Sequence, residues 1–303
     1  MELLSGVINS LPFLLTIITV ALLKRIKLLD DSHKNATTSI LFNLAIPALI
    51  IKLLSETTFD FSNSKFIIFG ILLWSLSILF GIIFFNIFRV DRRLKGSLVL
   101  SFIGFAVGPV VYPLMPLNYT SDAFVTLIVA DLMMFLLMMT VGYFIAIFYG
   151  NKGKFKLGES FKKIISSPIV WSIIFGVIVS LFNIDISFAN SFLNYVSSGF
   201  GFLAAVLLGL TLSIPSFSSS KIVFLSVFVK MFSSFIIALL LLNLLGITGE
   251  YREVLLILSL APTPLTALVL AEKEDLLTKE LGQITALSYL VGIILIPIMI
   301  GIL

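Results

Sequence analysis

Long apolar runs separated by short polar stretches dominate the chain. A helix needs about 20 apolar residues to cross roughly 30 Å of hydrocarbon, and a helix also satisfies its own backbone hydrogen bonds in lipid. A β-barrel would instead show alternating segments of about ten residues, which runs such as IIALLLLNLLG (236–246) do not. The pattern therefore predicts an all-α integral membrane protein. The ten predicted spans are 3–23, 36–54, 66–88, 97–117, 123–149, 168–182, 191–213, 222–246, 251–271 and 283–303.

Basic residues gather in alternate polar stretches between these spans. Lysine and arginine are enriched in cytoplasmic loops of membrane proteins. The bias places the odd-numbered loops, including the central one, in the cytoplasm and both termini outside a cell membrane. The stretches after the first, third and fifth spans hold most of the basic residues: Lys24, Arg25, Lys27 and Lys34; Arg89, Arg92, Arg93 and Lys95; Lys152, Lys154, Lys156, Lys162 and Lys163.

Composition agrees with a chain solvated by lipid. Hydrophobic residues make up 59% of the 303 residues and charged residues 12%, against about 45–50% and about 25% in soluble domains. The net charge of +4 reflects basic loops, and no nucleic-acid partner is expected. The absence of cysteine and the single histidine, His33, exclude thiolate and multi-histidine metal sites. We expect His33 to be solvated in a cytoplasmic loop, and we expect no metal or cofactor.

The longest polar stretch, Gly150 to Lys163, divides the chain into two halves of five spans each. An odd number of spans per half makes the second half enter the membrane from the opposite side, as in the inverted repeats of many transporters. The predicted organisation is a five-helix repeat over 1–149, a cytoplasmic linker over 150–167 and an inverted five-helix repeat over 168–303.

The fourth span of each half carries a proline cluster. SFIGFAVGPVVYPLMP (101–116) and LAPTPLTALVLAE (260–272) occupy corresponding spans. A proline inside a helix costs about 3 kcal/mol and frees carbonyl groups, which need protein or water partners in lipid. The clusters could be kinks that only shape packing, but paired interruptions in two repeats indicate a transport site.

A broken helix offers chemistry suited to an anion. Its free N–H groups and positive dipole end bind carboxylates without a basic side chain. An amide near a break, such as that of Asn43, could bond a ligand or a freed carbonyl, or only a neighbouring helix. The residues predicted to bind substrate are Asn43, Gly104, Gly108, Pro109, Tyr112, Pro113, Pro262, Thr263, Pro264 and Thr266.

Asp131 and Lys230 lie about nine residues inside the fifth and eighth spans, roughly 13 Å deep at about 1.5 Å per residue. An ionisable group at such depth costs at least about 2.5–3.5 kcal/mol, so both should face protein or water. They could serve the transport cycle, with Asp131 as a proton-coupling carboxylate. Alternatively, they form a buried structural ion pair, or Lys230 extends to the interface.

Several segments resemble a known family. The ninth span, APTPLTALVLAEKED (261–275), resembles the hallmark of the auxin efflux carrier family, which includes bacterial malate-type permeases and plant PIN-like carriers, with Pro262, Thr263 and Ala271 in register. IGFAVGP (103–109), FNLAIPALI (42–50) and SSPIVWSIIFGVIVSLFNI (166–184) resemble its fourth span, second span and start of the second half.

The resemblance implies inverted five-helix repeats, a scaffold domain beside a transport domain, and broken helices that cross near the substrate. It further implies an elevator-type movement and small carboxylates as substrates. Two positions depart from the family pattern: Phe102 and Thr266 stand where asparagines that line the ligand are common.

A secondary transporter of small organic anions is therefore the leading hypothesis; coupling to protons or sodium and assembly as a homodimer are left open. The chain contains no G-x-x-x-x-G-K-[ST] motif for ATP and no H-E-x-x-H motif, and only one deep aspartate, so an enzyme is not expected. The alternatives are a sodium-coupled bile-acid-type carrier and a ligand sensor that has kept the carrier fold.

Overall fold

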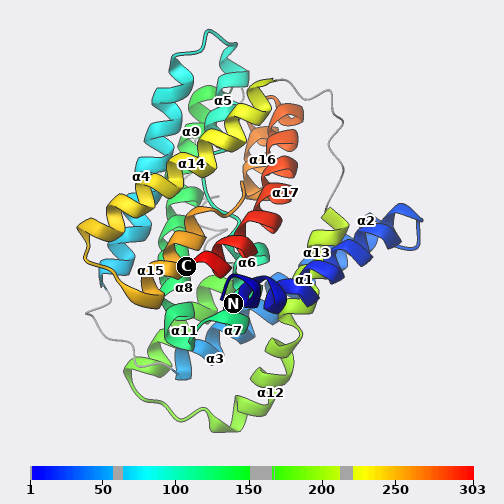
Figure 1. The fold of residues 1–303 in the computed structure, drawn as a ribbon, viewed down its shortest axis with the longest axis vertical. Helices are drawn as coiled ribbons and strands as arrows, with labels where there is room; N and C mark the ends of the chain where they lie inside the picture. Colours follow the sequence, from blue (N-terminus) through cyan, green and yellow to red (C-terminus); the bar gives the residue numbers. More distant parts are fainter. Residues whose placement is uncertain (1, 57–63, 151–165, 167, 212–220) are drawn as a thin grey trace.

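A computed structural model of the chain describes residues 2–56, 64–150, 166, 168–211 and 221–303. Within these ranges every regular element is a helix and no strand occurs (Figure 1). The α-helices are α1 (Glu2–Arg25), α2 (Asp31–Ile40), α3 (Ile46–Glu56), α4 (Ser64–Asn86), α5 (Arg92–Leu100), α6 (Val107–Val110), α7 (Met115–Asn118), α8 (Ser121–Leu137), α9 (Tyr143–Tyr149), α11 (Pro168–Leu181), α12 (Ser187–Ser198), α13 (Phe200–Thr211), α14 (Lys221–Leu244), α15 (Gly249–Ser259), α16 (Leu265–Lys273) and α17 (Thr278–Ile302). Two π-helical turns, η1 (Leu41–Ala45) and η4 (Met138–Gly142), and one 3-10 turn, η3 (Tyr112–Leu114), complete them.

The described helices include membrane-spanning lengths of apolar sequence. In the ranges given above, six helices are long and apolar enough to cross a bilayer, and α11 is a shorter apolar helix. This confirms the prediction of an all-helical membrane protein; ten spans and an internal repeat stay predictions. The six are Ser32–Glu56, Ser64–Asn86, Ser121–Tyr149, Ser187–Leu210, Lys221–Leu244 and Thr278–Ile302.

Large apolar side chains cover the outside of the helices as well as the interior. Ile83 on α4, Phe202 on α13 and Phe228 on α14 are 58%, 65% and 66% exposed. A helix that is apolar on all sides belongs in a core or in a membrane. Since these faces point outward, lipid is the solvent that they fit.

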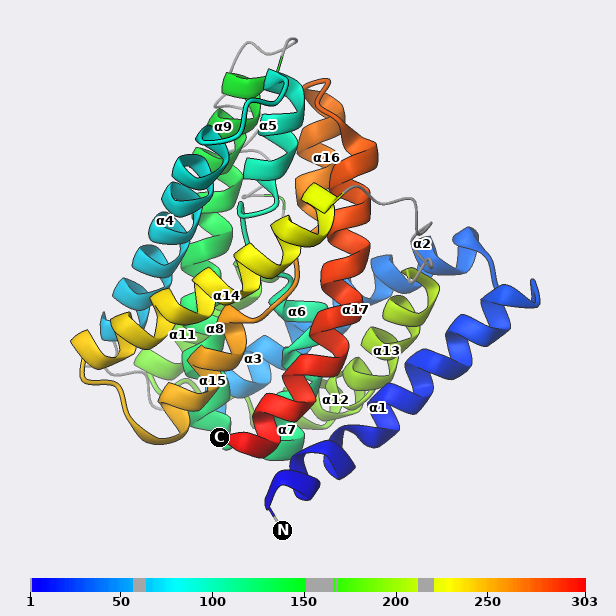
Figure 2. The same ribbon diagram turned by 45° about the horizontal axis from the view of Figure 1, so that its top comes forward.

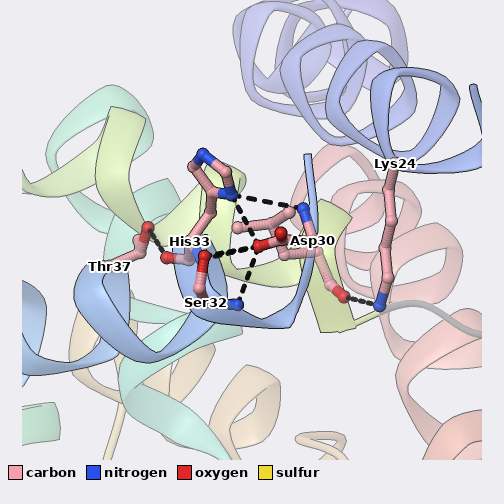
Figure 3. A network of polar contacts seen from close by, with 6 residues as sticks. Lys24, Asp30, Ser32, His33 and Thr37 are labelled. Carbon is pink, nitrogen blue, oxygen red and sulfur yellow. Dashed lines mark hydrogen bonds and ion pairs between the residues drawn. The ribbon is translucent and has the colours of Figure 1, made fainter. Parts of the chain in front are cut away.

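The predicted second span begins earlier than its hydropathy suggested. The side chain of Asp30 accepts hydrogen bonds from the backbone N–H groups of Ser32 (2.9 Å) and His33 (3.3 Å), so the helix starts at Asp31 rather than at residue 36. His33 Nδ1 lies 2.8 Å from Asp30 Oδ1 (Figure 3). His33 is exposed, as predicted, but it lies in the first helical turn and not in a loop. The side-chain hydrogen bonds from Ser32 and His33 hold the pKa of Asp30 well below its usual range.

The helices pack in two groups. In the first group, α3 packs against α11 and α12, and α13 packs against α1 and α2. In the second, α4 packs against α8 and α14, while α8, α14 and α17 contact α15. The groups meet where α1 packs against α17 and where α13 contacts α6. In the view of Figure 2, both termini lie at the lower end of the molecule, and α5, α9 and α16 lie towards the upper end.

A lysine at the end of α1 holds part of the first group together. Lys24 Nζ donates to the carbonyl oxygen of Leu210 on α13 at 2.5 Å (Figure 3). Along the same pair of helices, a Cβ at Gly209 would lie 2.7 Å from the carbonyl oxygen of Ile17. Only glycine at position 209 lets α1 and α13 approach each other this closely.

Candidate functional site

Both proline-containing spans are interrupted. The backbone between Leu100 and Val107 leaves the helix after α5 and resumes it at α6, and the backbone between Ser259 and Leu265 does so between α15 and α16 (Figure 2). We call residues 101–106 the first break and residues 260–264 the second break. Pro262 and Pro264 cannot donate backbone hydrogen bonds, which accounts for the second break. The first break precedes Pro109 by several residues, so its position depends on contacts made elsewhere.

Those contacts join the two breaks directly. The backbone N–H of Ala106 donates to the carbonyl oxygen of Pro262 at 2.8 Å. The hydroxyl of Thr263, which is completely buried, donates to the carbonyl oxygen of Ser101 at 3.0 Å. Segments about 160 residues apart thus satisfy each other's backbone groups, as unwound backbone in a membrane requires.

Side chains from neighbouring helices support both breaks. Trp74 Nε1 on α4 donates to the carbonyl oxygen of Ile103 at 2.6 Å. The backbone N–H of Thr263 donates to the hydroxyl of Ser288 on α17 at 3.1 Å. Gly292, one turn further along α17, lets Pro262 approach, because a Cβ there would lie 2.9 Å from its Cγ.

Lys230 occupies the space beside both breaks. Its side chain is completely buried, and Nζ donates to the carbonyl oxygen of Ala261 (3.2 Å) and the hydroxyl of Thr263 (3.4 Å). Nζ also lies 5.1 Å from the centroid of the Phe105 ring. Of the ion pairs that the described residues form, none joins Lys230 to Asp131, so the alternative of a structural pair between them is wrong.

A cavity of 430 Å³ lies between the two groups of helices and touches both breaks. The first group contributes residues of α2, η1, α3, α11 and α13, and the second contributes residues of α8, η4 and α17. Eight of the predicted site residues line it: Asn43, Gly104, Gly108, Pro109, Tyr112, Asp131, Pro264 and Thr266. The predicted residues Pro113, Pro262, Thr263 and Lys230 do not; Pro262 and Thr263 belong to the second break, and Lys230 donates hydrogen bonds to Ala261 and Thr263 there.

The cavity is mostly apolar, with a few polar groups at defined places. The hydroxyl of Tyr112 donates to Asp131 Oδ2 at 2.9 Å. The amide of Asn43, in the π-helical turn η1, is exposed and donates to the hydroxyl of Ser39 on its own helix at 3.2 Å, rather than to a freed carbonyl. Thr266 lies in the first turn of α16, before the first hydrogen bond of the helix, which runs from the N–H of Ala267 to the carbonyl oxygen of Pro264.

Sequence reasoning missed two polar residues of the lining, Thr38 and Tyr289. Both are polar residues within predicted spans and stand next to other polar residues, Thr37 and Ser39 for the first and Ser288 for the second, and this was the available signal. Of the two positions where the family resemblance implies asparagines, only Thr266 lines the cavity. Phe102 is fully buried and packs edge-on against Phe85, with ring centroids 6.0 Å apart.

The model of a family described as membrane transport proteins matches residues 7–300 of the chain. The chain belongs to this family. Its auxin efflux carriers and PIN-like proteins are those that the sequence motifs resemble. A comparison with curated proteins finds no match. Family membership and the apolar helices together establish a multi-pass membrane transporter, and the cavity between the two groups of helices is its candidate binding site.

Proposed function

We propose that the protein is a secondary carrier that moves a small organic carboxylate across the cell membrane and binds it in the cavity described above. The observation that carries the proposal is the position of that cavity: it touches both breaks and lies between two separately packed groups of helices. A volume of 430 Å³ falls within the range of about 300–1,000 Å³ that small-molecule sites have. Transporters bind substrate at such interrupted helices.

The first turn of α16 supplies the attraction for the anion. The helix begins at Leu265, directly after the second break. The N–H groups of Leu265 and Thr266 precede the first hydrogen bond of the helix, from Ala267 to Pro264, and together with the positive dipole end they favour an anion in the cavity that both residues line. The hydroxyl of Thr266 and the amide of Asn43 add two neutral hydrogen-bonding groups. Apolar side chains such as Phe42 and Phe135 surround them, which favours a carboxylate that carries a small hydrocarbon part.

Contacts within the second group of helices support alternating access in this proposal. Near one end, Arg93 on α5 forms an ion pair with Asp275 at 3.0 Å. Near the start of α8 and α15, the hydroxyl of Thr120 donates to Glu250 Oε2 at 2.5 Å. These bonds hold the helices that flank both breaks as one unit, which in our proposal shifts along α1, α3, α11 and α13 in an elevator-type movement.

Asp131 couples this movement to protons in our proposal. A carboxylate guest beside an ionised Asp131 would be repelled, whereas a protonated Asp131 presents a neutral group that can donate a hydrogen bond. Tyr112, bonded to Asp131, positions it within the cavity. Anion and proton would then enter together, with both termini and the even-numbered loops outside.

Reconstitution in liposomes with a panel of labelled carboxylates tests the proposal, with and without pH and sodium gradients. We expect saturable uptake of at least one carboxylate, with Thr266→Ala and Pro262→Ala reducing its rate at least about tenfold, the cost of about 1.4 kcal/mol. Val269→Ala is the matched control, since Val269 lies on α16, is 54% exposed and does not line the cavity.

Two outcomes would contradict the proposal. If both variants keep the full flux of the best substrate, the site lies elsewhere. If the protein binds a carboxylate but moves none in any gradient, it is a sensor on the carrier fold rather than a carrier.

A further inference from the structure

Lys230 stands near the middle of the apolar helix α14, and its side chain has no exposure to solvent or lipid. Charged residues at this depth are rare and usually functional. In the part of the chain that the structure describes, no ion pair involves Lys230. Its partners are neutral groups, so its role differs from that of a buried salt bridge.

The surroundings of Nζ match the needs of an ammonium group. An ammonium carries three N–H donors. Two of them meet the carbonyl oxygen of Ala261 at 3.2 Å and the hydroxyl oxygen of Thr263 at 3.4 Å. The face of the Phe105 ring lies 5.1 Å away, within the roughly 6 Å of a cation–π contact. Phe105 belongs to the first break, and Ala261 and Thr263 belong to the second.

Such a set of groups is also what a small cation would use. In transporters with interrupted helices, unwound carbonyls and the C-terminal ends of half-helices coordinate the coupling cation. Ala261 lies just after the C-terminal end of α15, where the carbonyl groups lack helical partners. Here these oxygen atoms are turned toward a side-chain ammonium.

Building on the proposed carrier function, we infer that the Lys230 ammonium is a tethered cation, which holds the two breaks together in place of a mobile alkali ion and makes the carrier independent of sodium. The ammonium moves with α14, so the breaks keep their cation throughout the cycle. Because Phe105 also lines the cavity, the positive charge lies directly behind the cavity wall. This position favours an anionic guest over a neutral one.

Two substitutions distinguish the effect of the Lys230 charge from the effect of its side-chain volume. Lys230→Met keeps most of the volume and removes the charge, whereas Lys230→Ala also leaves room for a small cation. Lys221→Ala, at the exposed start of the same helix, is the matched control. The readout is the melting temperature of the detergent-solubilised protein in chloride salts of sodium, potassium, N-methylglucamine, methylammonium and ethylammonium. This readout needs no substrate.

We expect the wild type and Lys221→Ala to melt at the same temperature in every salt. Lys230→Met and Lys230→Ala should melt at least about 3 °C lower in N-methylglucamine, from the loss of two hydrogen bonds to a charged donor. Methylammonium or ethylammonium should restore Lys230→Ala by mass action but should leave Lys230→Met unchanged, because the methionine side chain fills the space.

Three results would overturn the inference: a wild type whose melting or anion flux depends on sodium, a Lys230→Met that melts and transports like the wild type, or a Lys230→Ala that no cation restores. Should neither variant fold, the wild-type salt series still decides, since sodium dependence contradicts a tethered cation. If the wild type moves no carboxylate, the proposed function fails, while the melting experiment still tests Lys230.

Discussion

Replacing Thr263 with valine removes the hydroxyl that connects the two breaks and keeps the branched shape of the side chain. The residue is completely buried. Its hydroxyl donates to the carbonyl oxygen of Ser101 at 3.0 Å and accepts from Lys230 Nζ at 3.4 Å. We therefore expect Thr263→Val to weaken both the contact between the breaks and the binding of the Lys230 ammonium.

The expected cost follows from those two bonds. Depriving a buried carbonyl of its donor costs about 1–3 kcal/mol, and a hydrogen bond to a charged group contributes about 1.5–3 kcal/mol. Because one hydroxyl makes both bonds and the contact to Lys230 is long, we expect about 2–4 kcal/mol for Thr263→Val. Thr263→Ser keeps the hydroxyl and loses one buried methyl group, for about 1 kcal/mol.

Reversible unfolding in mixed micelles measures both variants on the same scale. The prediction is the difference between them, about 1–3 kcal/mol, with the serine variant the more stable. A difference below about 0.5 kcal/mol would be within the range of ordinary surface substitutions. It would show that the hydroxyl does not connect the breaks, whatever the absolute stabilities are.

Three further positions, Gly70, Asp131 and Asp30, give testable predictions. Gly70→Ala on α4 would place a Cβ 2.4 Å from a backbone oxygen of α8, so thermal unfolding should show a loss of stability of about 3 kcal/mol or more. The control Gly108→Ala, whose added Cβ has its nearest contact at 3.9 Å, should melt like the wild type. Equal melting temperatures of the two variants would refute this packing. Asp131→Asn should keep anion uptake but lose its acceleration by an inward proton gradient, and full acceleration in liposomes would exclude Asp131 as the coupling group. Because hydrogen bonds lower the folded-state pKa of Asp30, its contribution to stability is present above the unfolded pKa of about 3.9 and is lost as the pH falls through the folded pKa. The melting difference between wild type and Asp30→Asn should therefore be largest near neutral pH and shrink below about pH 4, and a difference that grows on acidification would contradict it.

Hydropathy predicts the helices because each helix must satisfy its own backbone hydrogen-bonding groups and present apolar side chains to lipid. Hydropathy is less reliable at the ends of the helices, where polar residues determine the first and last helical residue. Asp30 caps a helix that begins at Asp31 in a polar stretch, so the second span is longer than its apolar run. The π-helical turn at Leu41–Ala45 also cannot be predicted from a purely apolar pattern.

The prolines identified which spans are broken but not where the first one unwinds. That position depends on the hydrogen bond between Ala106 and Pro262, a contact between distant segments that local pattern does not encode. Depth alone marked Asp131 and Lys230 as unusual. Their partners, Tyr112 for the one and Ala261 for the other, follow from the three-dimensional arrangement, which also separates the cavity lining from the residues behind it.

The central claim, that a carboxylate binds in the cavity beside the first turn of α16, is tested most directly by thiol protection. The chain contains no cysteine, so Thr266→Cys carries the sole thiol, and Ser32→Cys at the exposed start of α2 is the control. The measurement is the rate at which a negatively charged methanethiosulfonate modifies each thiol with and without a saturating carboxylate substrate. We expect the substrate to slow modification at position 266 at least about tenfold and to leave the rate at position 32 unchanged, as occupancy at ten times Kd requires. Equal rates at position 266 with and without substrate would contradict it.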